Sequence, residues 1–354
     1  MRFFNFITAI SLAPLALAFP LNLTQPGTII GTTSHYTEVR GHTYHYLLAE
    51  PSSEPKGTVL LVHGLPDISY GWRYQVPAIT ALGYRVIAPD MLGYAGTDSP
   101  NSLIHWTHKE LATDLVNLVG QIAPDEQVIL GGHDWGAGLV YKVAMWYPDF
   151  VKALFTIAVP YMPPWLGLST DWRDLSDLVA DGTFPTLGYQ LQWRDPSIDR
   201  NFTTPSQIRM MFNTVFGGTT PEGAYGYSVS EGFLYDVMPL LQPNALVNSS
   251  DMDLYVNSIA RHGVRGVFNW YRTRRMDWED ELPLAKEEGT FRFRMPSLFI
   301  PALKDISMPE EYYRDMPGYF DSLAIRAVDA GHWTHWEGRE EVNDILTSWV
   351  KSLD

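Results

Sequence analysis

Cysteine is absent from this chain of 354 residues. Its absence excludes a disulfide framework, a Cys-ligated metal site and a cysteine nucleophile, and it leaves the redox compartment undefined. Basic residues are few: 25 Lys and Arg stand against 40 Asp and Glu, for a formal net charge of -15. Because polyanions are bound by basic patches, this balance disfavours nucleic acid and anionic membrane surfaces as partners. Blocks of like charge, internal repeats and low-complexity segments are also missing from the sequence.

The apolar run at the N-terminus, "FFNFITAISLAPLALA", is shorter than the ~20 residues that a membrane-spanning helix needs. Arg2 precedes it and Ala16-Leu17-Ala18 ends it, which is the pattern of a secretory signal peptide over residues 1–18. We therefore expect a protein that is secreted or lies in the lumen of the secretory pathway, without a stable membrane anchor. Three N-x-S/T sequons favour the same expectation and are candidate glycosylation sites: Asn22, Asn201 and Asn248.

Buried strands alternate with helices in the first half of the chain, which is 45% hydrophobic overall. After two extended segments that turn at Gly41 and His42, short apolar runs predict strands over 58–63, 84–90, 127–133 and 151–160. Between the second and third of these strands, Thr107 and Glu110 form the pattern of a capping box, followed by leucines at helical spacing. This alternation predicts a parallel sheet with both faces covered.

The alternation stops after Val159. Residues 163–292 are rich in Trp, Tyr and Met and contain helix-like segments, and a buried strand then returns in "MPSLFIPAL". A further strand over 323–332 and a closing helix over 340–353 complete the pattern. The sequence thus predicts one α/β sheet interrupted by a mainly helical cap at the carboxyl ends of the strands, where such sheets bind ligands. The expected division is a signal peptide (1–18), a core (19–162), a cap (163–292) and the rest of the core (293–354).

The stretch "GHDWG" (132–136) has the outline of a hydrolase nucleophile elbow, G-x-S-x-G, with Asp134 in the place of serine. A loop or a helix N-cap would explain Gly-x-Asp-x-Gly alone, but the strand before it and the helix after it favour the elbow. A carboxylate is already ionised at neutral pH, and it forms an ester when it attacks carbon. Such chemistry suits displacement at a saturated carbon with a strained or good leaving group.

Hydrolysis of that ester requires a water and a His–acid pair, and the late part of the chain contains both residue types. In "VDAGHWTHWEG", His332 follows a predicted strand and a glycine, and His335 is the competing candidate for the base. Asp305 follows the strand in "SLFIPAL" and is the candidate acid. The order Asp134, Asp305, His332 is the nucleophile–acid–base order of α/β hydrolases.

Several motifs in order resemble the soluble epoxide hydrolase family of the α/β-hydrolase fold, from about Tyr44 to Leu353. They are "HGLPD" (63–67), "GHDWGA" (132–137), "NWYR" (269–272) and "AGHWTHWE" (330–337). The resemblance implies a mostly parallel eight-stranded sheet flanked by helices, with an inserted helical cap. The chain departs from the family at Leu65, where an aromatic residue is common, and at Ala95, where Gly is usual. A secretory signal is also unusual beside the cytosolic relatives.

The resemblance also implies a role for each matching residue. Asp134 would be the nucleophile, and His332, oriented by Asp305, the base. The backbone N–H groups of Leu65 and Trp135 would form the oxyanion hole, in a pocket loop that contains His63, Gly64 and Pro66 and often has a cis bond before the proline. Tyr189 and Tyr271 would hold the epoxide oxygen and donate a proton to it. No metal or cofactor is implied.

The expected activity is therefore hydrolysis of a small, mostly apolar epoxide by water to a vicinal diol. A haloalkane dehalogenase shares the Asp nucleophile, but such relatives resemble H-G-N-P and use Trp or Asn in place of the two tyrosines. A biosynthetic enzyme that opens an epoxide internally and a non-catalytic ligand-binding protein of the same fold are further alternatives. The sequence leaves the particular epoxide and the oligomeric state open.

Overall fold

The computed structural model describes residues 29–163, 171–288 and 291–353, so the predicted signal peptide and Asn22 lie outside the described residues. Within those ranges, eight strands form one sheet in the order β1-β2-β4-β3-β5-β6-β9-β10. The strands are β1 (Thr32–Val39), β2 (His42–Ala49), β3 (Thr58–Val62), β4 (Arg85–Pro89), β5 (Val128–His133), β6 (Val151–Ile157), β9 (Ser297–Ile300) and β10 (Leu323–Ile325). β2 is antiparallel to both β1 and β4, and the remaining pairs are parallel. The predicted sheet is confirmed.

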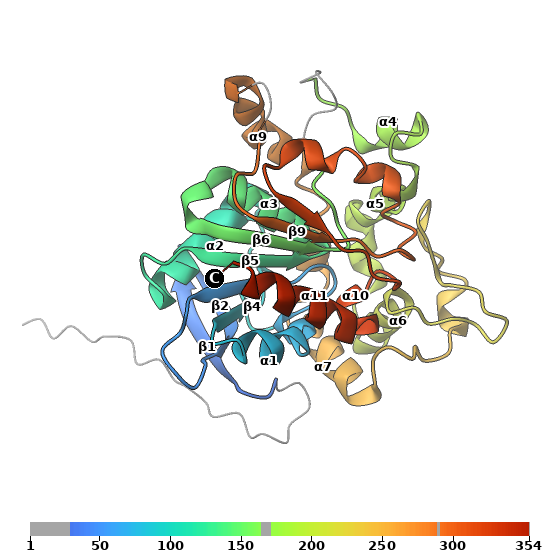
Figure 1. The fold of residues 1–354 in the computed structure, drawn as a ribbon. Helices are drawn as coiled ribbons and strands as arrows, with labels where there is room; N and C mark the ends of the chain where they lie inside the picture. The colour runs from blue at the N-terminus through green and yellow to red at the C-terminus, as the bar shows by residue number, and fades with distance from the viewer. Residues whose placement is uncertain (1–28, 164–170, 289–290, 354) are drawn as a thin grey trace, which may run out of the picture.

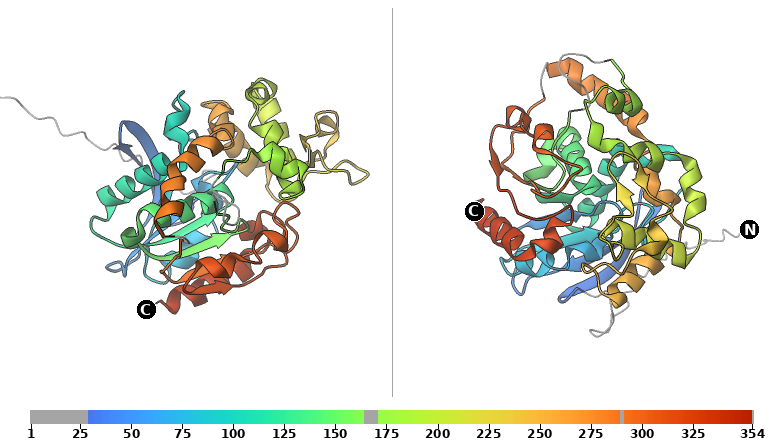
Figure 2. Two further views of the ribbon diagram at one scale, coloured as in Figure 1. Left: turned by 90° about the horizontal axis from the view of Figure 1, so that it is seen from above. Right: turned by 90° about the vertical axis from the view of Figure 1, so that its right-hand side faces the viewer.

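Helices cover both faces of this sheet (Figures 1 and 2). On one face lie α2 (His108–Ile122) and α3 (Trp135–Trp146), and on the other α1 (Gln75–Thr80) and α11 (Arg339–Lys351). The strands are buried on both sides: Leu60 and Val62 of β3 pack in the cluster that includes α2 and α3, whereas Val59 and Leu61 pack in the cluster that includes α1 and α11. This double burial explains the continuous apolar runs of the central strands.

The predicted capping box at the start of α2 is only half formed. Thr107 accepts a hydrogen bond from the backbone N–H of Glu110, at 3.3 Å. The carboxylate of Glu110 accepts instead from Arg40, at 2.6 Å, in the turn between β1 and β2. The tertiary ion pair therefore replaces the second half of the local motif.

Between β6 and β9 the chain leaves the sheet. The described residues of this stretch form the helices α4 (Leu175–Ala180), α5 (Tyr189–Trp193), α6 (Pro205–Val215), α7 (Ser249–Ala260), α8 (Arg265–Asn269) and α9 (Arg274–Glu288), with a two-stranded sheet of β7 (Tyr227–Ser228) and β8 (Gly232–Phe233). In Figure 1, α4 to α7 lie beside the sheet, and the short helix α10 (Thr334–Glu337) returns next to them. Among the described residues, none of the helices combines the length and the apolar character that a membrane crossing requires.

Candidate active site

Asp134 lies at the turn between β5 and α3, in a backbone conformation that is rare for a residue with a side chain (φ 52°, ψ -125°). The two flanking glycines make this turn possible. A Cβ at Gly132 would meet the carbonyl oxygen of Gly136 at 2.4 Å, and a Cβ at Gly136 would meet that of Val62 at 2.1 Å. The Gly-x-Asp-x-Gly spacing therefore has a steric reason: a side chain at either flanking position would clash with the main chain, as in a nucleophile elbow.

The structure brings three predicted residues together around this turn. Nε2 of His332 lies 3.3 Å from Oδ2 of Asp134, and Nδ1 of His332 lies 2.7 Å from Oδ2 of Asp305. Asp305 is held in turn by Ser307, whose backbone N–H and hydroxyl both donate to its Oδ1, at 2.9 and 2.6 Å. His335, the competing candidate for the base, is fully buried elsewhere. Of the two histidines, His332 is thus the one in contact with Asp134.

The charges of this group support one another. Burial opposes ionisation of Asp305, but the imidazolium of His332 outweighs it and lowers the pKa of Asp305 to about 2. The pKa of Asp134 is likewise held below its usual value, against burial, chiefly by His332. Burial alone would lower the pKa of His332, yet Asp305 and Asp134 raise it well above the usual value. The resting site is therefore an imidazolium between two carboxylates.

The loop after β3 reaches the same carboxylate. The backbone N–H of Leu65 donates to Oδ1 of Asp134, at 2.7 Å. Trp135 is the first residue of α3, so its N–H belongs to the first turn, where N–H groups lack intrahelical acceptors. The N–H of Leu65 is thus placed to stabilise negative charge on Oδ1. That the N–H of Trp135 also contributes to an oxyanion hole stays a prediction.

His63, Gly64 and Pro66 shape this loop and are not among the residues that line the cavity described below. A Cβ at Gly64 would lie 2.5 Å from that of Asp134, so only glycine allows the close approach. The peptide bond before Pro66 is cis. His63 is fully buried, and its Nε2 accepts a hydrogen bond from the backbone N–H of Met91, at 2.9 Å.

A cavity of about 190 Å³ opens over Asp134 and Trp135 and is lined on the cap side by Tyr189 and Tyr271. Tyr189 begins α5, Tyr271 follows α8, and their ring centroids are 6.1 Å apart. Burial raises the pKa of both phenols, so that both remain protonated at neutral pH and can donate a hydrogen bond. The structure thus gathers both tyrosines around one space with the carboxylate.

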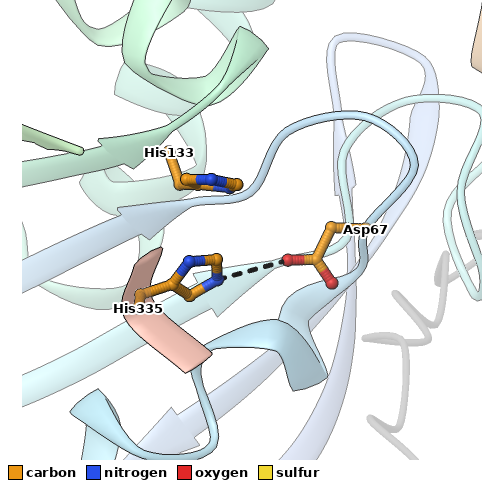
Figure 3. Close-up of side chains that lie close together, drawn as sticks. All are labelled: Asp67, His133 and His335. Atoms are coloured by element: carbon orange, nitrogen blue, oxygen red, sulfur yellow. Dashed lines mark ion pairs between the residues drawn. The ribbon is translucent and has the colours of Figure 1, made fainter. Parts of the chain in front are cut away.

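Three buried residues next to the site were not found from the sequence as a group: Asp67, His133 and His335 (Figure 3). They come from the loop after β3, the end of β5 and the helix α10. Nε2 of His335 lies 3.7 Å from Oδ2 of Asp67, and the rings of His133 and His335 are 4.1 Å apart. No spacing in the sequence marks this cluster, because its members come from three separate motifs.

The cluster has the residue types of a metal site, and its candidate ligand atoms lie within 4.8 Å of one another. The guanidinium of Arg73, however, already acts on this position: its charge adds to the burial that lowers the pKa of His335, and it opposes the burial that raises the pKa of Asp67. A metal ion would add a second positive charge there, which Coulomb repulsion opposes in a buried site. We therefore assign no metal to the cluster.

The two sequons within the described residues are exposed at the surface of the cap. Asn201 ends a short 3-10 helix (Pro196–Asn201). Asn248 caps α7: its side-chain oxygen accepts from the backbone N–H of Asp251 at 2.9 Å, and its amide donates to the Asp251 carboxylate at 3.0 Å. A glycan on Asn248 would have to share the amide nitrogen with this cap.

The fold and the site together define an α/β hydrolase in which an aspartate occupies the nucleophile position. Residues 57–186 match the sequence model of a protein family described as "alpha/beta hydrolase fold". Over 334 residues the chain is 37% identical to "Epoxide hydrolase srdG" of Neurospora crassa, with 91% of this chain and 96% of that protein covered. The chain belongs to the epoxide hydrolase family of the α/β-hydrolase fold.

More distant relatives agree with this assignment. The chain is 28% identical over 296 residues to "Bifunctional epoxide hydrolase 2" of Mus musculus, and the match spans about half of that relative (51%) and 82% of this chain. Among solved structures, an epoxide hydrolase from an endophytic Streptomyces superposes with a TM-score of 0.74 at 27% identity, over 92% of this chain and 96% of that chain.

Proposed function

We propose that this protein hydrolyses an epoxide to a vicinal diol through a covalent ester on Asp134. The observation that carries the proposal is the surroundings of this one carboxylate. It is bound by the N–H of Leu65, lies within 3.3 Å of His332, and shares a cavity with Tyr189 and Tyr271. The curated relatives named above are epoxide hydrolases, which supports the same reaction.

In the first step, Oδ2 of Asp134 attacks one epoxide carbon, because the N–H of Leu65 already engages Oδ1. The C–O bond of the ring breaks, and its electron pair stays on the epoxide oxygen. Tyr189 or Tyr271 donates a proton to that oxygen as the charge develops. The product is an ester between Asp134 and the ring-opened alcohol.

Before the second step, the imidazolium of His332 gives up its proton, which restores the phenol of Tyr189 or Tyr271 that protonated the epoxide oxygen. Ester formation favours this transfer, because it removes the negative charge of one of the two carboxylates that raise the pKa of His332. In the second step, the neutral His332 removes a proton from a water that attacks the carboxyl carbon of Asp134. The oxyanion develops on Oδ1, where the N–H of Leu65 is already in place. Collapse of this intermediate releases the diol and regenerates the carboxylate.

A single turnover in heavy-oxygen water tests the proposal. The first diol should carry unlabelled oxygen from the enzyme, and the label should appear in the peptide that contains Asp134. His332→Gln should still form the ester but hydrolyse it slowly, so that mass spectrometry finds an adduct on Asp134. His105→Gln, at a histidine outside the cavity lining, is the matched control and should not accumulate the adduct. Label in the first diol itself would mean direct attack by water and would contradict the ester mechanism.

The same experiments separate epoxide hydrolysis from the alternatives. A haloalkane dehalogenase would release halide from a haloalkane matched to the epoxide, and we expect diol formation without halide release. A ligand-binding protein without activity would form neither product. Asp134→Ala should abolish turnover, since no other residue in the proposal forms the ester.

We also propose that the protein enters the secretory pathway through residues 1–18. The apolar run with Ala16-Leu17-Ala18 and the exposed sequons at Asn201 and Asn248 support this. N-terminal sequencing of the secreted protein should find a chain that begins after Ala18. Retention of the full N-terminus in the cytosol would contradict the proposal.

A further inference from the structure

The cavity over Asp134 has a second, polar end. Beyond Trp135 its lining continues to five ionisable side chains, which come from the core helices α2 and α3 and from the cap helix α9: His108, Lys142, Arg274, Asp277 and Glu281. The ring of His108 lies 5.7 Å from that of Trp135, so this end begins directly beside the nucleophile turn. The lining also contains apolar and aromatic side chains, with Val159, Tyr161 and Leu175 among them.

Part of this polar group has a structural explanation. Nζ of Lys142 lies 2.7 Å from Oε2 of Glu281, and both side chains are buried. The backbone N–H of His108 donates to Oδ1 of Asp277, at 2.7 Å. These two contacts join the core to α9, and they would be enough to account for Lys142 and Asp277.

These two contacts do not account for every polar atom of the group. Among the described residues, both ring nitrogens of His108 and Oε1 of Glu281 are buried and have no hydrogen-bond partner. Nδ1 of His108 lies 3.8 Å from Oε1 of Glu281 and also 3.8 Å from Oδ2 of Asp277, and both distances are too long for a direct hydrogen bond. Buried polar groups in folded proteins are nearly always paired, so this gap calls for a partner that the chain itself does not provide.

A hydroxyl group has the donor and the acceptor that these two atoms lack, and it would reach them once the side chains of His108 and Glu281 move apart, because both atoms are closed to a water-sized group in this structure. An oxygen placed ~2.8 Å from both atoms would accept from an N–H of His108 and donate to the carboxylate of Glu281, at ordinary hydrogen-bond lengths. We propose that His108 and Glu281 form a subsite for a hydroxyl on the substrate, an alcohol or a phenol at the end of the molecule opposite the epoxide. This inference rests on the proposed epoxide hydrolysis and adds a substrate class to it.

Other polar groups fit less well at this position. A carbonyl group could accept from His108 but has no hydrogen to donate to Glu281. Burial would raise the pKa of Glu281, but Lys142, together with His108, holds it below its usual value, so the carboxylate is ionised. A substrate carboxylate at this point would therefore be repelled by Glu281 and by Asp277. Arg274, whose buried Nε also lacks a hydrogen-bond partner, is a place nearby where an anion could bind instead.

The size of the cavity limits the rest of the substrate. At about 190 Å³ it exceeds the cavity of roughly 150 Å³ that holds one benzene molecule in an engineered protein. A single ring that carries the epoxide on one side and the hydroxyl on the other is therefore of suitable size. The apolar and aromatic part of the lining matches such a ring.

Three matched styrene oxides test the proposal: the hydroxymethyl, the ethyl and the carboxyl derivatives, each as para and meta isomers. The hydroxymethyl and ethyl compounds differ only by OH against CH3. We expect kcat/KM for the better hydroxymethyl isomer to exceed that of its ethyl counterpart by about tenfold or more, and the carboxyl compound to be the poorest. A ratio near or below one, or a preference for the carboxyl compound, would overturn the hydroxyl subsite while leaving epoxide hydrolysis intact. If no compound is turned over, the proposed function itself fails.

His108→Phe then tests the residues. This change keeps a ring of similar size and removes both nitrogens, and it leaves the backbone N–H that binds Asp277 in place. The preference for hydroxymethyl over ethyl should fall to about one in this variant. His105→Phe, which changes a histidine outside the cavity lining, is the control and should keep the wild-type ratio. A preference that survives His108→Phe would overturn the assignment of the subsite to His108. The comparison of substrates on the wild-type enzyme decides the substrate class, and it does not depend on how well the variant folds.

Discussion

The backbone of Asp134 is strained, and contacts of the neighbouring residues hold it in that conformation. Residues with a Cβ at positive φ outside the usual regions lie about 1–3 kcal/mol above relaxed backbone. The turn persists because Gly132 and Gly136 pack directly against main-chain carbonyls and because Leu65 binds the side chain. Ala95, where the resembled family usually has Gly, also has a positive φ, of 43°. The departure noted in the sequence thus falls at a backbone conformation that favours glycine.

Tyr271→Phe should slow opening of the epoxide about 10- to 100-fold. A general acid contributes about 10²–10⁴-fold to a rate, and the expected loss lies at the lower part of this range because Tyr189 can still protonate the epoxide oxygen. Formation of the ester, measured by rapid quench and mass spectrometry, should slow, and hydrolysis of the preformed ester should not. Tyr227→Phe is the control, since Tyr227 packs 5.5 Å from Tyr189 but does not line the cavity. Equal rates for wild type and Tyr271→Phe would remove Tyr271 from the mechanism.

Residues inside local motifs could be predicted, and residues brought together only by the fold could not. Asp134, Asp305 and His332 each follow a strand in the expected chain order, and the structure places them in contact. His108 and Glu281 face each other across the boundary between core and cap. No periodicity or motif relates two such distant positions, because their contact depends on how α9 lies on α2.

At the scale of elements, three loops meet behind the nucleophile. The ring of His133, at the end of β5, donates from Nε2 to the backbone oxygen of His332, at 2.9 Å. His335, one turn further along the base loop, faces Asp67 of the loop that contains Leu65. The position of the base is thus fixed relative to the elbow and to the oxyanion loop by side chains that do not touch the cavity.

Asp67→Asn should stabilise the protein at alkaline pH. Burial raises the pKa of Asp67 from 3.8 to about 6, so the ionised form costs the folded state up to about 3 kcal/mol above pH 6. That cost disappears as the pH falls below 3.8, where Asp67 is protonated in both states. Asn keeps an oxygen for the hydroxyl of Tyr255, which donates to Oδ1 at 2.8 Å. We therefore expect a gain of about 1–2 kcal/mol in the free energy of unfolding at pH 8 and a smaller gain at pH 5.

Urea unfolding at the two pH values measures this difference. Asp329→Asn, at an exposed ion pair with Lys304, is the control and should change stability little at either pH. A gain from Asp67→Asn that is the same at pH 5 and pH 8 would show that the charge of Asp67 is not its source.

The last strand of the sheet shows why element boundaries are harder to predict than element types. The sequence predicts a strand over 323–332, but β10 ends at Ile325. Beyond it an isolated bridge joins Val328 to Ala302, and single backbone hydrogen bonds to the segment that follows β9 continue as far as Ala330. The chain therefore stays paired up to the loop of His332 without forming a regular strand, which is a tertiary detail that alternation of apolar residues does not encode.

For the molecule as a whole, the cap rests on the catalytic loops. The indole N–H of Trp333 in the base loop donates to the backbone oxygen of Val215 at the end of α6, at 2.9 Å. Tyr255 of α7 donates to Asp67, and Glu281 of α9 pairs with Lys142 of α3. An insertion at the carboxyl ends of the strands was predictable from the order of elements, whereas the side chains that join it to the core were not. The bounds of the cap, 163–292, stay a prediction.

The buried pair of Lys142 and Glu281 makes this joint testable. Lys142→Met leaves the carboxylate of Glu281 buried without its cation, and breaking a buried pair in this way costs about 3–5 kcal/mol. The double variant Lys142→Met with Glu281→Leu removes both charges, and we expect most of the lost stability to return, because a desolvated ion pair is worth little more than apolar side chains of similar size. The exposed pair of Arg275 and Glu279 on the same helix, also 2.7 Å apart, is the control, and Arg275→Met should cost less than about 1 kcal/mol. If Lys142→Met proved as mild as Arg275→Met in denaturant unfolding, the ion pair would not hold the cap on the core, and the aromatic contacts around Trp333 and Tyr255 would have to carry that role alone.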